Sequence, residues 1–389
     1  MSWSLIPLSD FVTIQKGKKH ETVELASQSS HRFIQIDDLR NDENIKYTDD
    51  SKGVIANVTD VIIAWDGANA GTIGFGKSGF IGSTLAKLSF DTEKVDTEYL
   101  GRFLQSKFRE LRENCTGATI PHISKRHLVS LKIPLPSLEI QKQIAAVLEK
   151  ADQLRKDCQQ MEQELNSLAQ SMFIDMFGSK APGYSEWPLH HIEELAESKK
   201  GSMRTGPFGS DLKHSEFVDE GIAVIGIDNA VKNEFAWGER RFITPEKYEK
   251  LKRYRVYPQD LIITIMGTTG RIAVIPNDIP LSISTKHLAV ITLDKEKVLP
   301  EFLAIAIKTH PDLLHQILDS NKGAIMDGLN LGLIKALSLK LPPLDLQSEY
   351  LAVLKVIQEQ VFESRSSLKQ HNDLFNALMQ KAFKGELNL

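Results

Sequence analysis

The sequence predicts a mixed α/β protein in which two globular parts alternate with two long helices. Apolar residues recur at alternating steps of four and three from Ile140 to Met172, and again from Tyr350 to Ala382. This period of about 3.5 residues is typical of helices that pair along a seam. The sequence around the first helix also reappears around the second, with Leu135 matching Leu341 at an offset of 206 residues. These observations indicate one unit, a globular part plus a helix, that occurs twice.

Length and composition are those of an ordinary globular protein. The 389 residues suffice for two or three domains with their own cores, and 41% hydrophobic and 25% charged residues are typical of soluble proteins. The net charge of −4 means that any surface for a polyanion must be local. Two cysteines, Cys115 and Cys158, are too few for a disulfide framework and suit a reducing compartment. With no leader-like start and no apolar run of about 18 residues, we expect a cytoplasmic protein without a membrane span.

The first helix is predicted to run without interruption, because neither proline nor glycine occurs from Leu138 to Phe177. At about 1.5 Å per residue it would span roughly 55–60 Å, which is longer than a compact domain needs. Its apolar stripe comprises Ile140, Ile144, Val147, Ala151, Leu154, Cys158, Met161, Leu165, Leu168 and Met172.

The second helix carries a matching stripe and is the expected partner of the first. This stripe comprises Tyr350, Leu354, Ile357, Val361, Ser364, Leu368, His371, Phe375, Leu378 and Ala382. Periodicity alone leaves open two amphipathic helices that pack on separate domains. For a paired coiled coil, the expected interface residues are Ile144, Val147, Leu154, Leu165, Leu354, Ile357, Val361 and Leu368.

The repeat is strongest where each globular part joins its helix. Leu-Pro-Ser-Leu-Glu-Ile-Gln at residues 135–141 reappears as Leu-Pro-Pro-Leu-Asp-Leu-Gln at residues 341–347. The same offset pairs Gly117-Ala118 with Gly323-Ala324, Ala146–Leu148 with Ala352–Leu354, and Phe177 with Phe383. Weaker upstream echoes pair Trp3 with Trp187, Ile62-Ile63 with Ile262-Ile263, Gly71–Gly74 with Gly270–Ala273, and Ser83-Thr84 with Ser284-Thr285. Diverged globular parts on a repeated frame suggest that the globular parts carry specificity and the helices carry assembly.

Local patterns give a coarse order of elements. The expected strands are residues 33–36, 61–65, 131–135, 222–227 and 261–265, with a helix over 99–112, a short helix after Pro121, and a glycine-rich, turn-like stretch over 66–82. Pro182 and Gly183 end the first helix in a linker. The predicted domains are residues 1–136, 137–180, 181–342 and 343–389, of which the second and fourth are the helical spacers.

One segment formally matches a phosphate-binding loop. Gly-Thr-Ile-Gly-Phe-Gly-Lys-Ser at residues 71–78 fits the pattern GxxxxGK[ST], which needs a strand before it and a helix after it. The glycine-rich residues that follow are a poor helix start, and the repeat counterpart at Gly270 has no matching lysine or serine. A tight turn is therefore favoured over a nucleotide site. His190-His191 is interpreted as surface or strand edge, and no catalytic or zinc-spaced set is found.

Basic, glycine-containing loops occur at corresponding places in the two globular parts. Lys16–His20 and Lys199–Arg204 each follow the repeated tryptophan, and such loops can neutralise phosphates and present side chains to base edges. Solvated lysines with no ligand are the competing interpretation. The candidate DNA-binding residues are Lys16, Lys18, Lys19, Lys77, Lys199, Lys200, Arg204, Lys213, Arg271 and Lys286.

With these residues in view, the chain resembles the specificity subunits of Type I restriction-modification systems. The resemblance is carried by the two Leu-Pro-[Ser/Pro]-Leu-x-x-Gln junctions and by helix endings at Phe177-Gly178 and Phe383-Lys384-Gly385. Gly-Pro-Phe-Gly-Ser at residues 206–210 is also similar to an element of that family's target recognition domains, and the first globular part lacks it.

The resemblance implies two target recognition domains, each reading one half of a bipartite DNA sequence, separated by two antiparallel helices with pseudo-twofold symmetry. It implies no catalytic activity and no cofactor in this chain. The implied partners are double-stranded DNA, two modification subunits that methylate adenine with S-adenosylmethionine, and, in some complexes, restriction subunits that use ATP and Mg²⁺. The alternatives from other classes are a coiled-coil scaffold with two protein-binding heads and an NTPase that uses residues 71–78.

Overall fold

The computed structural model describes residues 3–24, 26–117, 119–320 and 329–387. The predicted match between Gly117-Ala118 and Gly323-Ala324 cannot be followed in full, because Ala118, Gly323 and Ala324 lie outside these ranges. The chain forms two compact units: residues 1–160 with 364–389, and residues 161–363. Each unit thus contains one globular domain and a segment of both long helices, whereas the predicted division keeps each helix whole.

The first domain contains two four-stranded sheets. One is antiparallel in the order β2-β9-β6-β7, and the other has the order β4-β3-β8-β5 with β3 and β8 parallel. The strands are β1 (Leu5–Pro7), β2 (Thr13–Lys16), β3 (His31–Ile34), β4 (Lys46–Thr48), β5 (Ile55–Ala56), β6 (Val61–Ala64), β7 (Ile73–Phe75), β8 (Gly79–Ile81), β9 (Leu85–Ser89) and β10 (Lys132–Pro134). β1 and β10 form a separate antiparallel pair beside the start of the long helix.

Three short helices complete the first domain: α1 (Thr97–Ser106), α2 (Phe108–Glu113) and α3 (Lys125–Ser130). Asp96 caps α1, because its side chain accepts a hydrogen bond from the amide of Tyr99 at 2.9 Å. The apolar face of α1 enters the core, where Tyr99, Leu100 and Leu104 are fully buried. The glycine-rich stretch 66–82, predicted as turn-like, contains β7 and β8, and the helix predicted over 99–112 is divided between α1 and α2 at Lys107.

The second domain repeats this topology strand for strand. Its sheets have the orders β12-β19-β16-β17 and β14-β13-β18-β15, again with one parallel pair, β13 and β18. The strands are β11 (Leu189–His191), β12 (Met203–Thr205), β13 (Ile222–Ile225), β14 (Phe242–Ile243), β15 (Arg255–Val256), β16 (Leu261–Thr264), β17 (Ile272–Val274), β18 (Ser282–Ser284), β19 (Leu288–Ile291) and β20 (Ser338–Lys340). The helices are α5 (Pro245–Leu251), α6 (Pro300–Thr309), α7 (Pro311–Ser320) and α8 (Leu331–Ala336).

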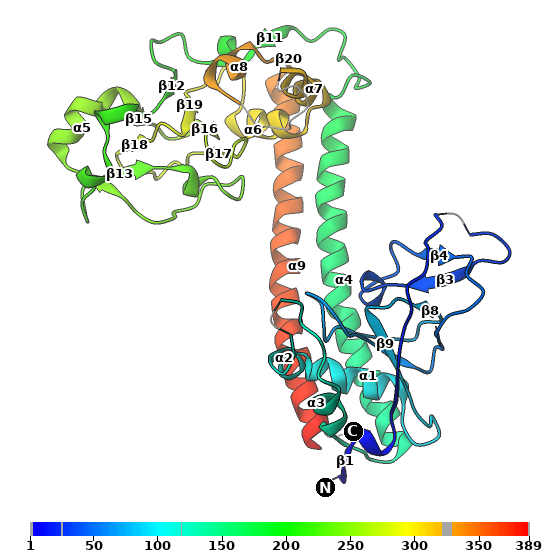
Figure 1. Cartoon of the computed structure of the whole chain (residues 1–389). Helices are drawn as coiled ribbons and strands as arrows, with labels where there is room; N and C mark the ends of the chain where they lie inside the picture. Colours follow the sequence, from blue (N-terminus) through cyan, green and yellow to red (C-terminus); the bar gives the residue numbers. More distant parts are fainter. Residues whose placement is uncertain (1–2, 25, 118, 321–328, 388–389) are drawn as a thin grey trace. The chain divides into compact units, whose positions relative to one another are not determined.

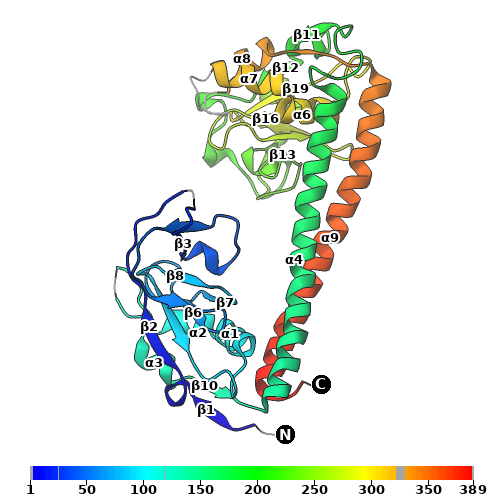
Figure 2. The same cartoon turned by 90° about the vertical axis from the view of Figure 1, so that its right-hand side faces the viewer.

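The two long helices are α4 (Leu138–Phe177) and α9 (Leu344–Lys384), and each is continuous. In the first unit they lie side by side (Figures 1 and 2). Arg155 Nε donates to Asn372 Oδ1 at 2.8 Å, and the Ser364 hydroxyl donates to the Cys158 carbonyl at 2.9 Å. Because higher numbers on α4 meet lower numbers on α9, the helices of this unit are antiparallel, as predicted. In the second unit the hydroxyl of Tyr350 on α9 donates to the carbonyl of Ala169 on α4 at 3.1 Å.

The seam of α9 follows the predicted stripe, whereas the seam of α4 follows it only in part. Leu154 is 39% exposed, so its assignment to the helix interface is wrong, and Met161 and Leu168 of the same stripe are also exposed. Arg155 occupies the seam in place of Leu154: its guanidinium carbon lies 4.5 Å from the ring centroid of Phe375. A guanidinium can stack on an aromatic face and still donate a hydrogen bond from its edge, as Arg155 does to Asn372. Of the other predicted interface residues, Ile144, Ile357 and Val361 are buried, and Val147, Leu165, Leu354 and Leu368 are half-buried.

Candidate nucleic-acid interface

The repeated junction glutamines join each domain to a long helix. Gln141 on α4 is fully buried; its Oε1 accepts from the amide of Asp96 and its Nε2 donates to the Pro136 carbonyl, both at 2.9 Å. Gln347 on α9 makes the equivalent bonds: its Oε1 accepts from the amide of Leu299 at 2.9 Å, and its Nε2 donates to the Pro342 carbonyl at 2.8 Å. A buried amide with both ends bonded holds the loop before α1 or α6 against the start of the long helix.

The repeated phenylalanines close the other contact between helix and domain. In the first unit the ring of Phe383, at the end of α9, lies 5.3 Å from the rings of both Tyr99 and Phe103. In the second unit Phe177, at the end of α4, lies 4.9 Å from the ring of Phe302. Each domain is thus packed on the start of one long helix and on the end of the other.

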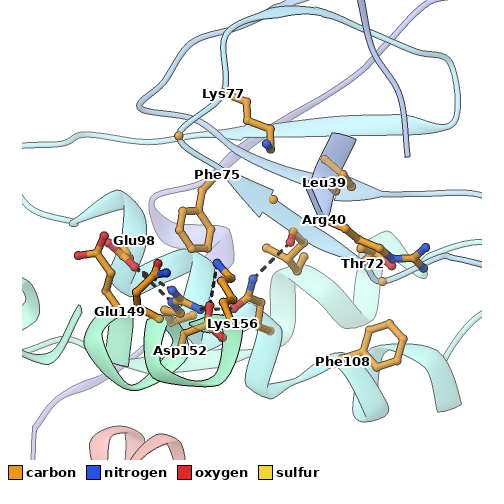
Figure 3. Close-up of a pocket in the computed structure, with 17 residues that line it drawn as sticks. Leu39, Arg40, Thr72, Phe75, Lys77, Glu98, Phe108, Glu149, Asp152 and Lys156 are labelled. Carbon is orange, nitrogen blue, oxygen red and sulfur yellow. Dashed lines mark hydrogen bonds and ion pairs between the residues drawn. The ribbon is translucent and has the colours of Figure 1, made fainter. Parts of the chain in front are cut away.

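A cavity of about 780 Å³ in the first unit lies between the domain and α4. Figure 3 shows Phe75 and Lys77 on the domain side, and Glu149, Asp152 and Lys156 on α4. Arg102 also lines this cavity and donates to Glu98 at 3.1 Å and to Asp152 at 3.0 Å.

Asp152 is held in its charged form by this network. Burial raises the pKa of Asp152, but hydrogen bonds and positive charge from Arg102 and Lys156 outweigh burial and bring the pKa below its ordinary value. The buried Arg102 is therefore neutralised inside the protein. The cavity lies where domain and helix meet, and four of its charged residues, Glu98, Arg102, Asp152 and Lys156, are paired with one another.

The predicted basic residues of the first domain differ in availability. Lys16 donates to Asp66 at 2.8 Å, and Lys77 donates to Asp42 at 2.8 Å with a side chain only 13% exposed. Lys18 and Lys19 are exposed and have no ion pair among the described residues. Lys18 and Lys19 are therefore the cations of this loop that are free to meet a ligand.

Residues 71–78 do not form a phosphate-binding loop. They contain β7, and the chain passes from β7 through a turn at Gly76, with φ of 69°, into β8. Because no helix follows, there is no helix N-terminus to face a nucleotide phosphate, and the NTPase alternative is wrong.

Arg204 is a structural residue, and its prediction as a DNA contact is wrong. It lies on β12, is 9% exposed, and donates to the fully buried carboxylate of Asp260 at 2.6 Å. It also donates to the Arg255 carbonyl at 2.6 Å and to the Thr292 hydroxyl at 3.0 Å. The guanidinium is fully used in joining β12 to its neighbours, so no donor is left for a phosphate.

A basic cluster surrounds Tyr257 near Arg204. It consists of Lys199, Lys200, Lys252, Arg253 and Lys295, and it lines a cavity of about 610 Å³. Lys252 and Arg253 contact Glu249 and Asp211 at 3.3 and 3.5 Å, whereas the other three have no ion pair among the described residues. Sequence reasoning missed Lys295, because it follows β19 and is distant in sequence from the other members.

The remaining predicted basic residues of the second domain lie on loops. Lys213 and Arg271 are exposed, and Lys286 is half-buried between β18 and β19. His190 and His191 lie on β11, where His190 contacts Glu194 at 3.3 Å and His191 contacts the Ala336 carbonyl at 3.1 Å. Within the described ranges, no three His, Cys, Asp or Glu side chains group as a metal site, and no helix is long and apolar enough to cross a membrane.

A family model places the chain in a known class. The family model described as Type I restriction modification DNA specificity domain matches residues 2–167 and 184–370. The chain therefore belongs to this family, with one match for each globular domain and its helix.

Its relatives are specificity subunits of Type I restriction enzymes. The MjaVIII subunit of Methanocaldococcus jannaschii is 27% identical over 77% of this chain and 73% of its own length. The EcoBI subunit of Escherichia coli is 23% identical over 99% of this chain and 86% of its own length.

Two solved structures share the fold over almost the whole chain. The S subunit of a Type-I restriction-modification system from M. genitalium gives a TM-score of 0.58 at 16% identity, covering 98% of this chain and 96% of that one. A chain from a structure of complex assembly and conformational transition of the type I R-M system gives 0.59 at 16% identity, covering 99% and 98%. At this identity the likeness shows the fold alone.

Proposed function

We propose that this chain is the sequence-specific DNA-binding subunit of a Type I restriction-modification complex, in which each domain reads one half of a bipartite target. The observation that carries the proposal is the duplication: one frame of sheets and junctions occurs twice, with different exposed loops on each copy. An asymmetric two-part sequence needs two readers with different contacts, since each base pair presents its own pattern of donors and acceptors. The family description and the names of the relatives support the same function.

The proposal gives the long helices two tasks. They would set the number of base pairs between the two half-sites, and they would dock two modification subunits. Those subunits would bind S-adenosylmethionine and methylate adenine, and this chain would supply no catalytic group. Restriction subunits that use ATP and Mg²⁺ would be an optional addition to the complex. We place the complex in the cytoplasm, with the DNA.

Reconstitution of the full chain with candidate modification subunits tests the proposed function. Methylated adenines mapped across a bacterial genome are expected to fall in one asymmetric motif, with two specified parts separated by unspecified bases. Modification subunits without this chain serve as the control and should give no such motif. If the complex forms but neither binds nor methylates DNA, the proposal fails, and a scaffold with two protein-binding heads becomes the better account.

A further inference from the structure

Two cavities lie at the same place in the two domains. The first, about 470 Å³, lies beside the turn that follows β3, and the second, about 360 Å³, lies beside the turn that follows β13. In each domain, that turn forms part of the wall. The loop between β6 and β7, or between β16 and β17 in the second domain, also lines the cavity. A further part of the wall is the loop that follows the parallel partner strand, β8 or β18 (labelled in Figure 1).

Strand pairing shows which lining residues of the two cavities are equivalent. β3 and β8 pair Ile34 with Ile81, and β13 and β18 pair Ile225 with Ser284. The amide that follows Ile81 donates to the Ile34 carbonyl at 3.0 Å, and the amide that follows Ser284 donates to the Ile225 carbonyl at 2.9 Å. The loops after β8 and β18 therefore leave their strands at equivalent positions.

The correspondence continues through both loops. The amide that follows β6 donates to the Thr84 carbonyl at 2.7 Å, and the amide that follows β16 donates to the His287 carbonyl at 2.8 Å. Thr84 and His287 are thus equivalent. On the opposite wall, Asn69 and Thr268 are equivalent, because each lies two residues before a glycine whose amide donates at 2.8 Å to the last carbonyl of β6 or β16.

The frame of each cavity is the same. The Ile-Asp pair at residues 36–37 recurs at residues 227–228, in the same short turn. The side chain of Asp38 accepts from the amide three residues earlier at 2.7 Å, and the side chain of Asn229 accepts from the equivalent amide at 2.9 Å. These bonds hold the turn in one conformation whatever the neighbouring side chains are.

The side chains on this common frame differ in hydrogen-bonding character. The equivalent lining pairs that differ are Gln35 and Gly226, Asn69 and Thr268, Gly82 and Thr285, and Thr84 and His287. Amide, hydroxyl and imidazole groups are the side chains that donate to and accept from base edges, and exchanging them changes which base is accepted. A constant frame with variable polar groups is the pattern expected of two readers with different targets.

Several of these groups have hydrogen-bonding capacity to spare. Thr285 is 8% exposed, and its buried hydroxyl has no partner among the described residues. Burial and the positive charges of Lys286 and Arg241 lower the pKa of His287, so its ring is neutral near pH 7, with one nitrogen to donate and one to accept.

The first cavity offers the same kind of groups. The carbonyl of the Asn69 side chain accepts from Arg40 at 2.7 Å, and its NH₂ has no partner in the described part of the chain. Thr84 and Lys19 both line this cavity and are exposed. A cation next to polar readers suits a ligand with phosphates beside its bases.

We propose that these two cavities are the base-reading sites: Asn69 and Thr84 contact bases of one half-site, and Thr268 and His287 contact bases of the other. This inference rests on the proposed function and makes it specific to residues. It requires each cavity to control one half of the methylated motif without affecting the other half.

The test compares double variants within the full complex. Asn69→Ala with Thr84→Val changes the first cavity, and Thr268→Val with His287→Ala changes the second. Methylome mapping is expected to show one half-site relaxed by the first pair and the other half-site by the second. Discrimination at the affected position should fall roughly ten- to a hundred-fold, the value of one lost base contact. Thr92→Val and Asn277→Ala, both exposed and outside the cavities, are the matched controls and should keep the wild-type motif.

The possible outcomes separate the two proposals. If the wild-type complex yields no bipartite motif, the proposed function fails and the cavities lose their role with it. If the wild type yields the motif and both double variants keep it with unchanged rates at near-cognate sites, the cavities are not the readers. Equal relaxation of both half-sites by one pair would also overturn the inference. Where a variant stops methylation, competition binding with duplexes altered in one half-site measures the same discrimination, and thermal melting verifies the fold.

Discussion

At the residue scale, Lys199 and Arg204 show how neighbours of equal charge can have different tasks. Arg204 is buried against Asp260 at 2.6 Å, whereas Lys199 is exposed in the basic cluster. A guanidinium that neutralises a buried carboxylate is not available to a phosphate. Lys199, Lys200 and Lys295 are therefore the members of the basic cluster that we expect to act on DNA.

Replacing Lys199, Lys200 and Lys295 with alanine is expected to flatten the salt dependence of DNA affinity. Each lost phosphate contact should reduce the slope of log affinity against log salt by about 0.9, because fewer counterions are released on binding. Fluorescence anisotropy titrations of the complex at several salt concentrations measure this slope.

Arg204→Ala is the contrasting variant for the same experiment. It should lower the stability of the second domain by about 3–5 kcal/mol, because Asp260 is left buried without its partner. At a temperature where this variant stays folded, its slope should match the wild type. An unchanged slope in the triple variant, or a reduced slope in Arg204→Ala, would show that the cations on DNA have been assigned wrongly.

The sequence could show that residues 199–213 are basic, but not which members are exposed. β12 is only three residues long and lies inside a stretch rich in glycine, so no alternation revealed that Arg204 is a buried strand residue. Its partner Asp260 is distant in sequence and is recognisable only in the folded chain. The reading cavities were missed for the same reason: each is lined by segments that are far apart in the sequence.

At the element scale, the long helices were the most predictable part of the molecule. No proline or glycine interrupts them, and the observed ends at Leu138, Phe177, Leu344 and Lys384 lie close to those expected. The error concerned the face of α4. Its sequence contains two possible heptad stripes, which share Ala151 and Cys158 but differ at the positions between them. The more apolar of the two stripes contains Leu154, and it was therefore predicted as the interface. The structure uses the other stripe, because Arg155 can stack on a ring and bond to α9 at once.

This assignment predicts different effects of truncation at Phe375 and Leu154. Phe375→Ala removes a ring that is 8% exposed and should destabilise the first unit by about 3–5 kcal/mol. Leu154→Ala changes an exposed position and should stay within about 0.5 kcal/mol of the wild type. Denaturant midpoints of the two variants provide the comparison. A larger loss of stability for Leu154→Ala than for Phe375→Ala would show that Leu154 belongs to the helix interface after all.

At the scale of the whole molecule, the duplication explains both what the sequence revealed and what it hid. Gln141 and Gln347 differ by 206 positions, but the equivalent strand residues Ile34 and Ile225 differ by 191. Loops of unequal length cause this change of offset. A sequence comparison at a single offset therefore detects the repeated junctions but not the equivalent strands.

Unequal loops also misled the upstream match. Ser83-Thr84 was paired with Ser284-Thr285, whereas strand pairing aligns Thr84 with His287. Sheet topology is held by backbone hydrogen bonds, which tolerate almost any side chain, and the repeated frame therefore survives where sequence similarity does not.

The central claim is that one unit of reader and helix occurs twice, with the helices setting the distance between half-sites. Seven residues inserted after Gln160 on α4 and seven after Glu363 on α9 keep the heptad register of both helices. Each insertion adds about 10 Å of helix, close to the rise of three base pairs. Methylome mapping of the complex that carries both insertions is the most direct test. The account predicts a motif with the same half-site bases and a longer spacer, and a motif with altered half-sites and the original spacer would contradict it.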